Sequence, residues 1–298
     1  MTSPSGDPQR ILYGIGLAVA GYASFSIQDA IIKWLVPHYA VFEILFVRSV
    51  LIIMIMAVVT RGTALIDLAR SRNKPALLAR GALVLLAWSS YYTAARSLGL
   101  AELVTLYFAA PLFVVILSTV ILKEKVTGAR WIAVLVGLAG VILAANPGSG
   151  VALVPAMLAL FAAFAWGWTN ILVRILGRTE KTTTQVMAAS IIFAVPCGLS
   201  MPWLWITPTP FDALLLACLA VFGGLGQYAV FESLRHAPAS AVAPFEYSAL
   251  VWAFILGFFV FHDIPAPSVF MGAVLIIGSG VGLLVVEARN ARRASRIT

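Results

Sequence analysis

Charged residues are scarce in this chain of 298 residues, because Asp, Glu, Lys and Arg together make up only 11% of it. A soluble domain carries about a quarter charged residues, which cover a surface that faces water. Hydrophobic residues make up 61% of the chain, and the mean hydropathy is +0.99. This composition excludes an ordinary soluble domain and predicts a protein whose surface lies largely in lipid.

Cysteine and histidine are also rare, with two and three residues respectively. Cys197 and Cys218 both fall in apolar stretches, with neither metal-binding spacing nor a disulfide framework. The sequence has no glycine-rich loop between a strand and a helix that would hold a phosphate group. We therefore expect no metal, no cofactor and no catalytic residues, and we predict that the protein is not an enzyme.

Ten long apolar segments fill most of the chain. A membrane-spanning helix needs about 20 mostly apolar residues, and these segments do not alternate with the period of two that barrel strands show. The sequence therefore predicts an all-α integral membrane protein with ten transmembrane helices. The segments are 11–33, 40–60, 76–97, 101–122, 130–146, 151–176, 183–204, 211–235, 240–261 and 267–287.

The ten segments form two sets of five that resemble each other at a shift of roughly 140 residues. Because five is odd, a second set that directly follows the first must enter the membrane upside down. Inverted repeats of this kind are typical of transporters that work by alternating access. We predict repeats at 11–147 and 151–287, an N-terminal segment 1–10 and a basic tail 288–298. The clearest matches pair Phe25 with Trp166, Asp29 with Asn170, Lys33 with Arg174 and Tyr92 with Tyr228.

The net charge of +8 is distributed unevenly over the loops. Basic residues gather in alternate loops, and by the positive-inside rule these loops and both termini are predicted to be cytoplasmic. The location expected is the bacterial inner membrane, with lipid headgroups rather than nucleic acid as partners of the basic residues. The loop and tail residues are Arg61, Arg70, Arg72, Lys74, Arg80, Lys123, Lys125, Arg130, Arg174, Arg178, Lys181, Arg235, Arg289, Arg292, Arg293 and Arg296.

Several short motifs resemble the drug/metabolite transporter (DMT) superfamily, in its ten-helix form with two EamA repeats. The resemblance implies that the first, third, fourth, sixth, eighth and ninth helices surround a central cavity. It is strongest to bacterial exporters of aromatic and other amino acids. The motifs are Pro111-Leu112-Phe113, Leu122 to Thr127, Gly137 to Val141, Ala241 to Phe245 with Tyr247, Leu250 to Ala253, Gly257 and Phe261 to Pro265.

Aromatic and polar residues concentrate in the segments that the resemblance places around the cavity. Trp88 and Tyr92 are four residues apart and share one helix face. Such groups either bind substrate or join helices through hydrogen bonds. Pro111, Gly167 and Pro244 are predicted hinge or gate residues, since proline removes a helical hydrogen bond. The predicted substrate-binding residues are Gln28, Trp88, Tyr91, Tyr92, Tyr107, Phe108, Trp166, Asn170, Tyr228, Glu246, Tyr247 and Trp252.

A few charged residues fall inside the apolar segments, where an unpaired ion is costly. Asp29 and Lys33 are four residues apart, which predicts a local pair near the outer end of the first helix. Arg48 lies deeper and needs an acid or carbonyl groups, with Asp29 and Glu43 as candidates. Glu246 is predicted either to cap an inner gate or to touch the substrate.

These residues predict a secondary transporter that exports small metabolites, most plausibly amino acids, by alternating access. We expect no acid in the middle of the first or sixth helix and no basic cluster, which favours an uncharged or zwitterionic substrate and weakly coupled transport. Aromatic rings stack on apolar groups and also receive an ammonium group. One alternative is a drug or quaternary-cation exporter that uses Glu246, and another is a structural or lipid-binding membrane subunit. The expected partners are an amino-acid-like small molecule and lipid, and we expect a monomer.

Overall fold

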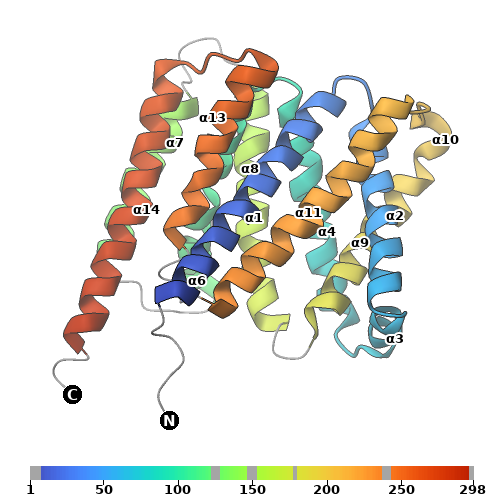
Figure 1. The fold of residues 1–298 in the computed structure, drawn as a ribbon, viewed down its shortest axis with the longest axis horizontal. Coiled ribbons are helices and arrows are strands. Elements are labelled where there is room, and N and C mark those ends of the chain that lie inside the picture. Colours follow the sequence, from blue (N-terminus) through green and yellow to red (C-terminus); the bar gives the residue numbers. More distant parts are fainter. Residues whose placement is uncertain (1–7, 122–127, 146–152, 177–179, 237–242, 295–298) are drawn as a thin grey trace.

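The computed structural model describes residues 8–121, 128–145, 153–176, 180–236 and 243–294. Within these residues every regular element is a helix and no strand occurs, which confirms the predicted all-α class. The long helices run side by side across a single bundle (Figure 1). Their apolar composition leaves many large side chains exposed, as expected for a surface that faces lipid.

Helices of the first half follow the predicted segments closely, with one short addition and one break. The addition is α3, which contains Asp67 and Arg70 and joins two long helices. The helices are α1 Pro8–Leu35, α2 Val41–Val59, α3 Thr63–Arg70, α4 Lys74–Ala95, α5 Leu100–Tyr107, α6 Ala110–Ile121 and α7 Gly128–Ala145.

The break separates α5 from α6 inside the predicted segment 101–122. Pro111 is the second residue of α6, a position where its missing N–H needs no helical partner. Just before it, the Ala109 N–H donates to the carbonyl of Leu106, three residues back, in a tighter turn than an α-helix makes. The interruption predicted at Pro111 is therefore confirmed, whereas its role as a hinge stays a prediction.

The second half repeats this order from α8 onward. Its ninth predicted segment also starts irregularly, because a 3₁₀-helix precedes α13. The helices are α8 Leu153–Leu176, α9 Thr182–Leu199, α10 Met201–Leu204, α11 Pro210–His236, the 3₁₀-helix η2 Ala243–Tyr247, α13 Ser248–Phe261 and α14 Pro267–Ala294.

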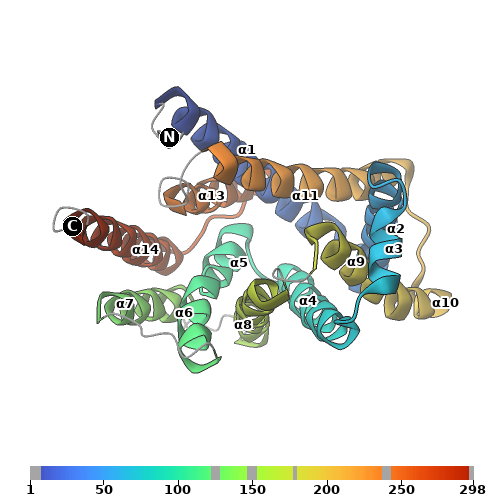
Figure 2. The same ribbon diagram turned by 90° about the horizontal axis from the view of Figure 1, so that it is seen from below.

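Packing between the halves follows the two-fold relation that a repeat demands. In chain order α1 corresponds to α8, and α4 corresponds to α11. The structure packs α1 against α11 and packs α4 against α8, so that each contact is the repeat-related copy of the other. Corresponding helices also pair directly: α7 with α14 at one end of the bundle and α2 with α9 at the other (Figure 2). The structure thus joins two similar halves around a common centre.

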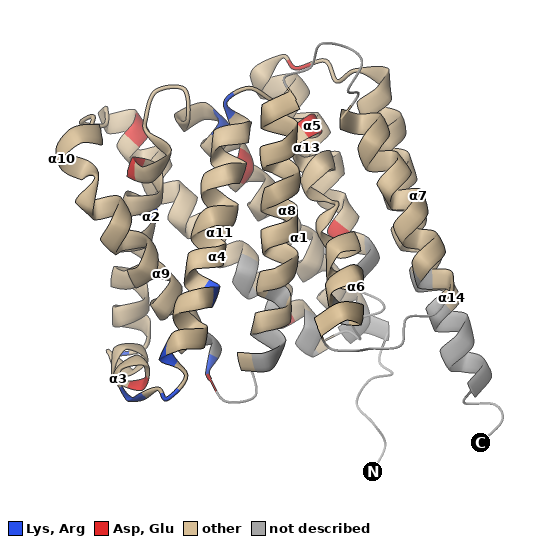
Figure 3. Cartoon of the chain, turned by 180° about the vertical axis from the view of Figure 1, so that it is seen from behind, with Lys and Arg blue, Asp and Glu red and all other residues tan. Residues whose placement is uncertain are grey.

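Length and composition mark three described stretches as candidate membrane spans: Leu12–Leu35, Val41–Val59 and Leu100–Ile121. Shorter apolar helical stretches occur in α7, α8, α9, α11, in η2 with α13, and in α14. The number of ten crossings and the residue limits of the two repeats stay predictions. The start of α1 and the end of α14 lie at the same side of the bundle (Figure 1), and many of the described Lys and Arg residues gather near that side, around α3 (Figure 3). A cytoplasmic place for this side stays a prediction.

The pairing of α7 with α14 depends on two glycines. A Cβ atom on Gly140 would lie 2.8 Å from the backbone oxygen of Gly272. A Cβ atom on Gly272 would lie 2.5 Å from the oxygen of Gly140 and 2.8 Å from Cβ of Ala144. The two backbones therefore touch, and any larger side chain at either position must push the helices apart.

We expect Gly272→Val to lower the free energy of unfolding by about 1–3 kcal/mol, the usual cost of overpacking. The matched control is Gly278→Val in the same helix, because a Cβ atom there meets nothing within 4 Å among the described residues. Thermal unfolding of the purified protein in detergent measures both. Equal melting temperatures for the two variants would contradict the close approach of α7 and α14.

Candidate functional site

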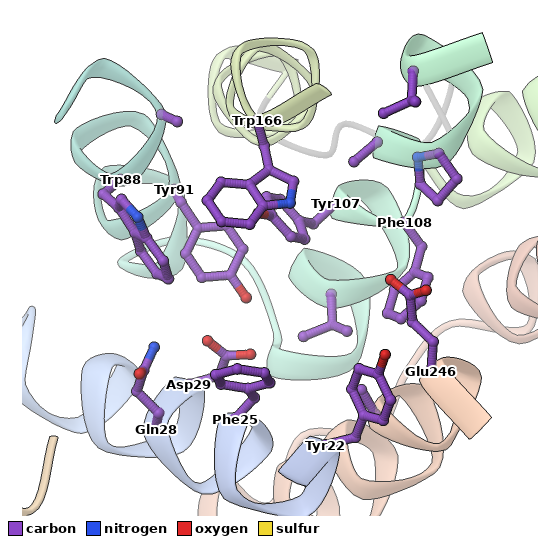
Figure 4. A pocket seen from close by; sticks show the side chains of 16 residues that line it. Tyr22, Phe25, Gln28, Asp29, Trp88, Tyr91, Tyr107, Phe108, Trp166 and Glu246 are labelled. Atoms are coloured by element: carbon purple, nitrogen blue, oxygen red, sulfur yellow. The ribbon is translucent and has the colours of Figure 1, made fainter. Parts of the chain in front are cut away.

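A cavity of about 420 Å³ lies at the centre of the bundle, among α1, α4, α5, α6, α8, η2 and α13 (Figure 4). Its size falls in the range of sites that hold metabolite-sized ligands. The side chains come from both halves of the chain. They are Tyr22, Phe25, Gln28, Asp29, Ala87, Trp88, Tyr91, Val104, Tyr107, Phe108, Ala110, Pro111, Val114, Trp166, Glu246 and Ala249.

The structure places most of the predicted site residues in this lining, although their binding of substrate stays a prediction. Tyr92, Tyr247 and Trp252 do not line the cavity. The side chains of Asn170, Tyr228 and Pro244 lie outside the described part of the chain. The predicted residues that do line the cavity are Gln28, Trp88, Tyr91, Tyr107, Phe108, Trp166, Glu246 and Pro111.

Four aromatic residues from three helices form one wall of the cavity. Trp88 and Tyr91 of α4 have ring centroids 6.1 Å apart, and Trp88 lies 6.3 Å from Trp166 of α8. Tyr91 in turn lies 5.0 Å from Tyr107 of α5. All three contacts are edge-to-face, the arrangement that aromatic pairs prefer. Because each ring is held by its neighbour, the wall offers a fixed surface on which a planar ligand can stack.

Tyr92 was expected in the cavity but is fully buried behind this wall. Its ring contacts Trp88 at 5.5 Å between centroids. Successive helical residues point about 100° apart, because a turn takes 3.6 residues. Tyr91 and Tyr92 therefore point in different directions from α4, and of the two it is Tyr91 that belongs to the cavity lining.

Tyr247 and Gly167 help to pack the helices near the cavity. The Tyr247 ring lies 5.6 Å from that of Phe108, and it occupies the space that a side chain on Gly280 of α14 would need. A Cβ atom on Gly167 would lie 3.1 Å from Cβ of Phe113. Gly167 therefore lets α8 approach α6 just after the break at Phe108 and Ala109, and its role as a hinge stays a prediction.

Asp29 is a cavity residue, and the prediction that it pairs with Lys33 was wrong. The carboxylate of Asp29 lies near the hydroxyl of Tyr91 and faces the cavity (Figure 4). The missed signal is the spacing of Tyr22, Phe25 and Asp29, three and four residues apart, which places all three on one face of α1. Asp29 lies near the end of α1 rather than in its middle, yet it brings an acid into the cavity lining.

Lys33 instead forms an ion pair with Asp263, which follows α13. The distance from Lys33 Nζ to Asp263 Oδ2 is 2.7 Å. Lys33 also donates to the carbonyl of Leu98 at 2.9 Å, and Asp263 accepts from the N–H of Leu100 at 3.1 Å. The pair joins α1, the start of α5 and the end of α13, and so connects the two halves. It lies one turn beyond Asp29 along α1, at the side of the bundle away from the termini.

Glu246 supplies a second carboxylate, and it lies at the opposite end of the cavity from Asp29 (Figure 4). It extends from η2, where the irregular start of α13 turns its side chain inward. No Lys or Arg belongs to the described lining, so the two carboxylates dominate the charge of the cavity. A charged group in a membrane interior is costly unless it has a partner, and a cationic ligand would provide one.

Arg48 lies directly behind the aromatic wall. Its guanidinium carbon is 4.6 Å from the centroid of the Trp88 ring, a cation–π contact. Its charge also acts on Asp29, although the two do not form an ion pair within 4 Å. Glu43, the other candidate partner, accepts a hydrogen bond from the N–H of Ile206 at 3.2 Å and so holds the loop after α10.

Comparison with known proteins identifies the family. The model of the EamA-like transporter family matches the chain twice, over residues 12–146 and 153–285. A protein from Rickettsia prowazekii named as an S-adenosylmethionine uptake transporter is 27% identical, over 94% of this chain and 95% of its own length. Its counterpart from Rickettsia bellii is 26% identical, over 93% and 94%.

The chain is also similar to a relative named for a different substrate and to a solved structure. A protein from Vibrio cholerae named as a riboflavin transporter is 30% identical over 70% of each chain. A crystal structure matches 95% of this chain and 98% of its own with a TM-score of 0.63 and 17% identity, which shows the shared fold. With both repeats matched and the fold in agreement, the chain belongs to the EamA-like transporter family of the DMT superfamily and is a membrane transporter.

Proposed function

We propose that this protein carries a small organic cation with an aromatic ring across the membrane. The cation belongs to the chemical class of S-adenosylmethionine. The observation that carries the proposal is the pair of carboxylates, Asp29 and Glu246, at the two ends of a cavity with an aromatic wall. The names of the relatives from Rickettsia support the same substrate class.

S-adenosylmethionine suits such a cavity because of its charges and its shape. It carries a sulfonium, an ammonium and a carboxylate group, and so a net charge of +1. The adenine ring can stack on the wall formed by Trp88, Trp166 and Tyr107, and a sulfonium is attracted both to ring faces and to a carboxylate. Asp29 and Glu246 lie apart in the cavity (Figure 4), which gives the two positive groups separate partners.

Export of a neutral amino acid is the second candidate, and the aromatic wall favours it. An aromatic side chain would stack against Trp88 or Trp166 as adenine would. This substrate gives only one ammonium group to the cavity, so that one of the two carboxylates keeps its charge without a ligand partner. The expectation of weakly coupled transport rested on the absence of an acid in the middle of the first and sixth helices, and Asp29 in the lining weakens that ground.

The two sides of the cavity differ in a way that suits alternating access. Beyond Asp29, the ion pair of Lys33 with Asp263 and the carbonyl of Leu98 tie α1 to both neighbouring segments. In the opposite direction the lining continues to Tyr22 and Glu246, toward the side where α1 begins. We infer that this conformation is closed on the side of the ion pair and open on the side of the termini.

We expect Asp29→Asn and Glu246→Gln each to raise the dissociation constant for S-adenosylmethionine about ten- to a hundredfold. Each variant removes one charge-assisted contact of roughly 1.5–3 kcal/mol. Titration calorimetry on the purified protein measures the constant. The matched control is Asp67→Asn, since Asp67 pairs with Lys181 at 2.9 Å on the exposed surface.

The same preparations decide between the two substrates. Proteoliposomes that contain the wild-type protein are loaded with unlabelled S-adenosylmethionine or with an unlabelled aromatic amino acid. Counterflow is then measured as the uptake of the same compound in labelled form. Counterflow of the amino acid alone, unaffected by Asp29→Asn, would overturn the cation proposal in favour of the neutral substrate.

A labelling experiment tests which side of the cavity is open. In a background that carries Cys197→Ala and Cys218→Ala, we expect Val114→Cys in the lining to react faster with an impermeant maleimide applied from the side of the termini. The reason is that the lining continues to that side, whereas the Lys33 ion pair blocks the other. Ile264→Cys is the control for the opposite side, because Ile264 is 84% exposed after α13. Faster reaction of Val114→Cys from the side of Ile264 would reverse the assignment.

A further inference from the structure

We propose that the end of the cavity next to Arg48 binds the α-amino-acid head group of the substrate, with its carboxylate on Arg48 and its ammonium on Asp29. The inference rests on the proposed function and narrows it. It requires that a transported cation also carry an amino-acid head group, which simple amines and quaternary ammonium compounds lack.

The position of Arg48 gives the first argument. Gln28 and Trp88 both line the cavity, and the guanidinium of Arg48 lies against Trp88 with the hydroxyl of Tyr92 beside it. A basic side chain thus lies one layer behind the wall, at the end of the cavity that Asp29 marks. To reach Arg48, the carboxylate of the substrate must enter between Gln28 and Trp88, which separate it from the cavity.

Unpaired polar atoms give the second argument. Gln28 is 2% exposed, yet its Oε1 atom has no hydrogen-bond partner among the residues that the structure describes. The buried Nε of Arg48 has no such partner there either. A buried polar atom without a hydrogen-bond partner is unfavourable. The acceptor Oε1 of Gln28 and the charged donor Nε of Arg48 therefore indicate a polar ligand.

The packing of α11 explains why these two side chains meet. A side chain on Gly223 would collide with Oε1 of Gln28, and its Cβ would lie 3.7 Å from Nη2 of Arg48. The amide and the guanidinium therefore share the space that the missing side chain leaves. This arrangement brings a donor for a carboxylate and an acceptor for an ammonium next to Asp29.

The chemistry of the cluster matches an amino-acid head group. A guanidinium presents its N–H donors in a plane that fits the two oxygens of a carboxylate. Asp29 and Oε1 of Gln28 accept hydrogen bonds from an ammonium group. The three charges of Asp29, Glu246 and Arg48 sum to −1, which balances a ligand with two positive groups and one carboxylate.

The test compares S-adenosylmethionine with its decarboxylated form, which differs only in the carboxylate. The quantity measured by calorimetry is the ratio of their dissociation constants, decarboxylated over intact. We expect this ratio to fall about ten- to a hundredfold in Arg48→Gln relative to wild type, because only the intact ligand loses a partner. In Arg48→Lys, which keeps the charge without the planar donors, we expect a smaller fall.

The matched control is Arg80→Gln. Arg80 lies on α4 and, like Arg48, is largely enclosed. It donates to the carbonyl of Gln185 at 3.2 Å and is not part of the cavity lining. Its ratio should equal that of wild type. An unchanged ratio in Arg48→Gln, or in Arg48→Lys if Arg48→Gln does not fold, overturns the head-group site and leaves cation transport standing.

Failure of the proposed function gives a different result. If wild type binds neither adenosyl compound, that proposal is overturned, and the ratio is measured with tryptamine over tryptophan, which differ in the same way. A fall of this ratio in Arg48→Gln supports the head-group site for a neutral amino acid. An unchanged ratio, or no binding of tryptophan, overturns it.

Discussion

The arrangement of this protein depends on one constraint, namely that an ionised group within a bilayer needs a partner or access to water. The protein therefore has few charged residues in its interior, and each occupies a particular environment. Lys33 and Asp263 satisfy each other, and Glu43 accepts from the backbone of the loop after α10. Asp29, Glu246 and Arg48 are left around the central cavity. These three charged groups are therefore the ones that the proposed ligand would meet.

The two repeats build a symmetric frame, and the charges break its symmetry. The contacts of α1 with α11 and of α8 with α4 are copies of each other, as are the direct pairs of corresponding helices. In the repeat alignment, however, Asp29 corresponds to Asn170, so one half brings a carboxylate where the other brings an amide. In many transporters built from repeats, alternating access is a rocking of one repeat against the other around a fixed site. Selectivity requires a particular set of groups, which duplication followed by divergence at a few positions supplies.

The sequence predicted the helical segments, the break at Pro111 and much of the aromatic lining, because each leaves a local pattern. An apolar run, a proline and a cluster of aromatic residues can all be recognised without neighbours. The pairing of Lys33 was missed because its partner, Asp263, is distant in sequence and leaves no periodic signal. The spacing of Asp29 and Lys33 suggested the wrong pair, although Tyr22 and Phe25 already marked the cavity face. Tyr92 was misplaced because the face of α4 that meets Trp166 depends on how α8 packs.

Charge balance also bears on which step of transport is slow. When both carboxylates are ionised and no ligand is bound, Asp29, Glu246 and Arg48 leave the cavity with a net charge of −1. A conformational change must then carry this charge through a state closed to water on both sides, where an unbalanced ion is costly. A bound monocation cancels the charge, so the loaded protein meets a lower electrostatic barrier than the empty one. A carrier with this property exchanges substrate across the membrane faster than it completes a one-way cycle, because only the one-way cycle includes the return of the empty cavity.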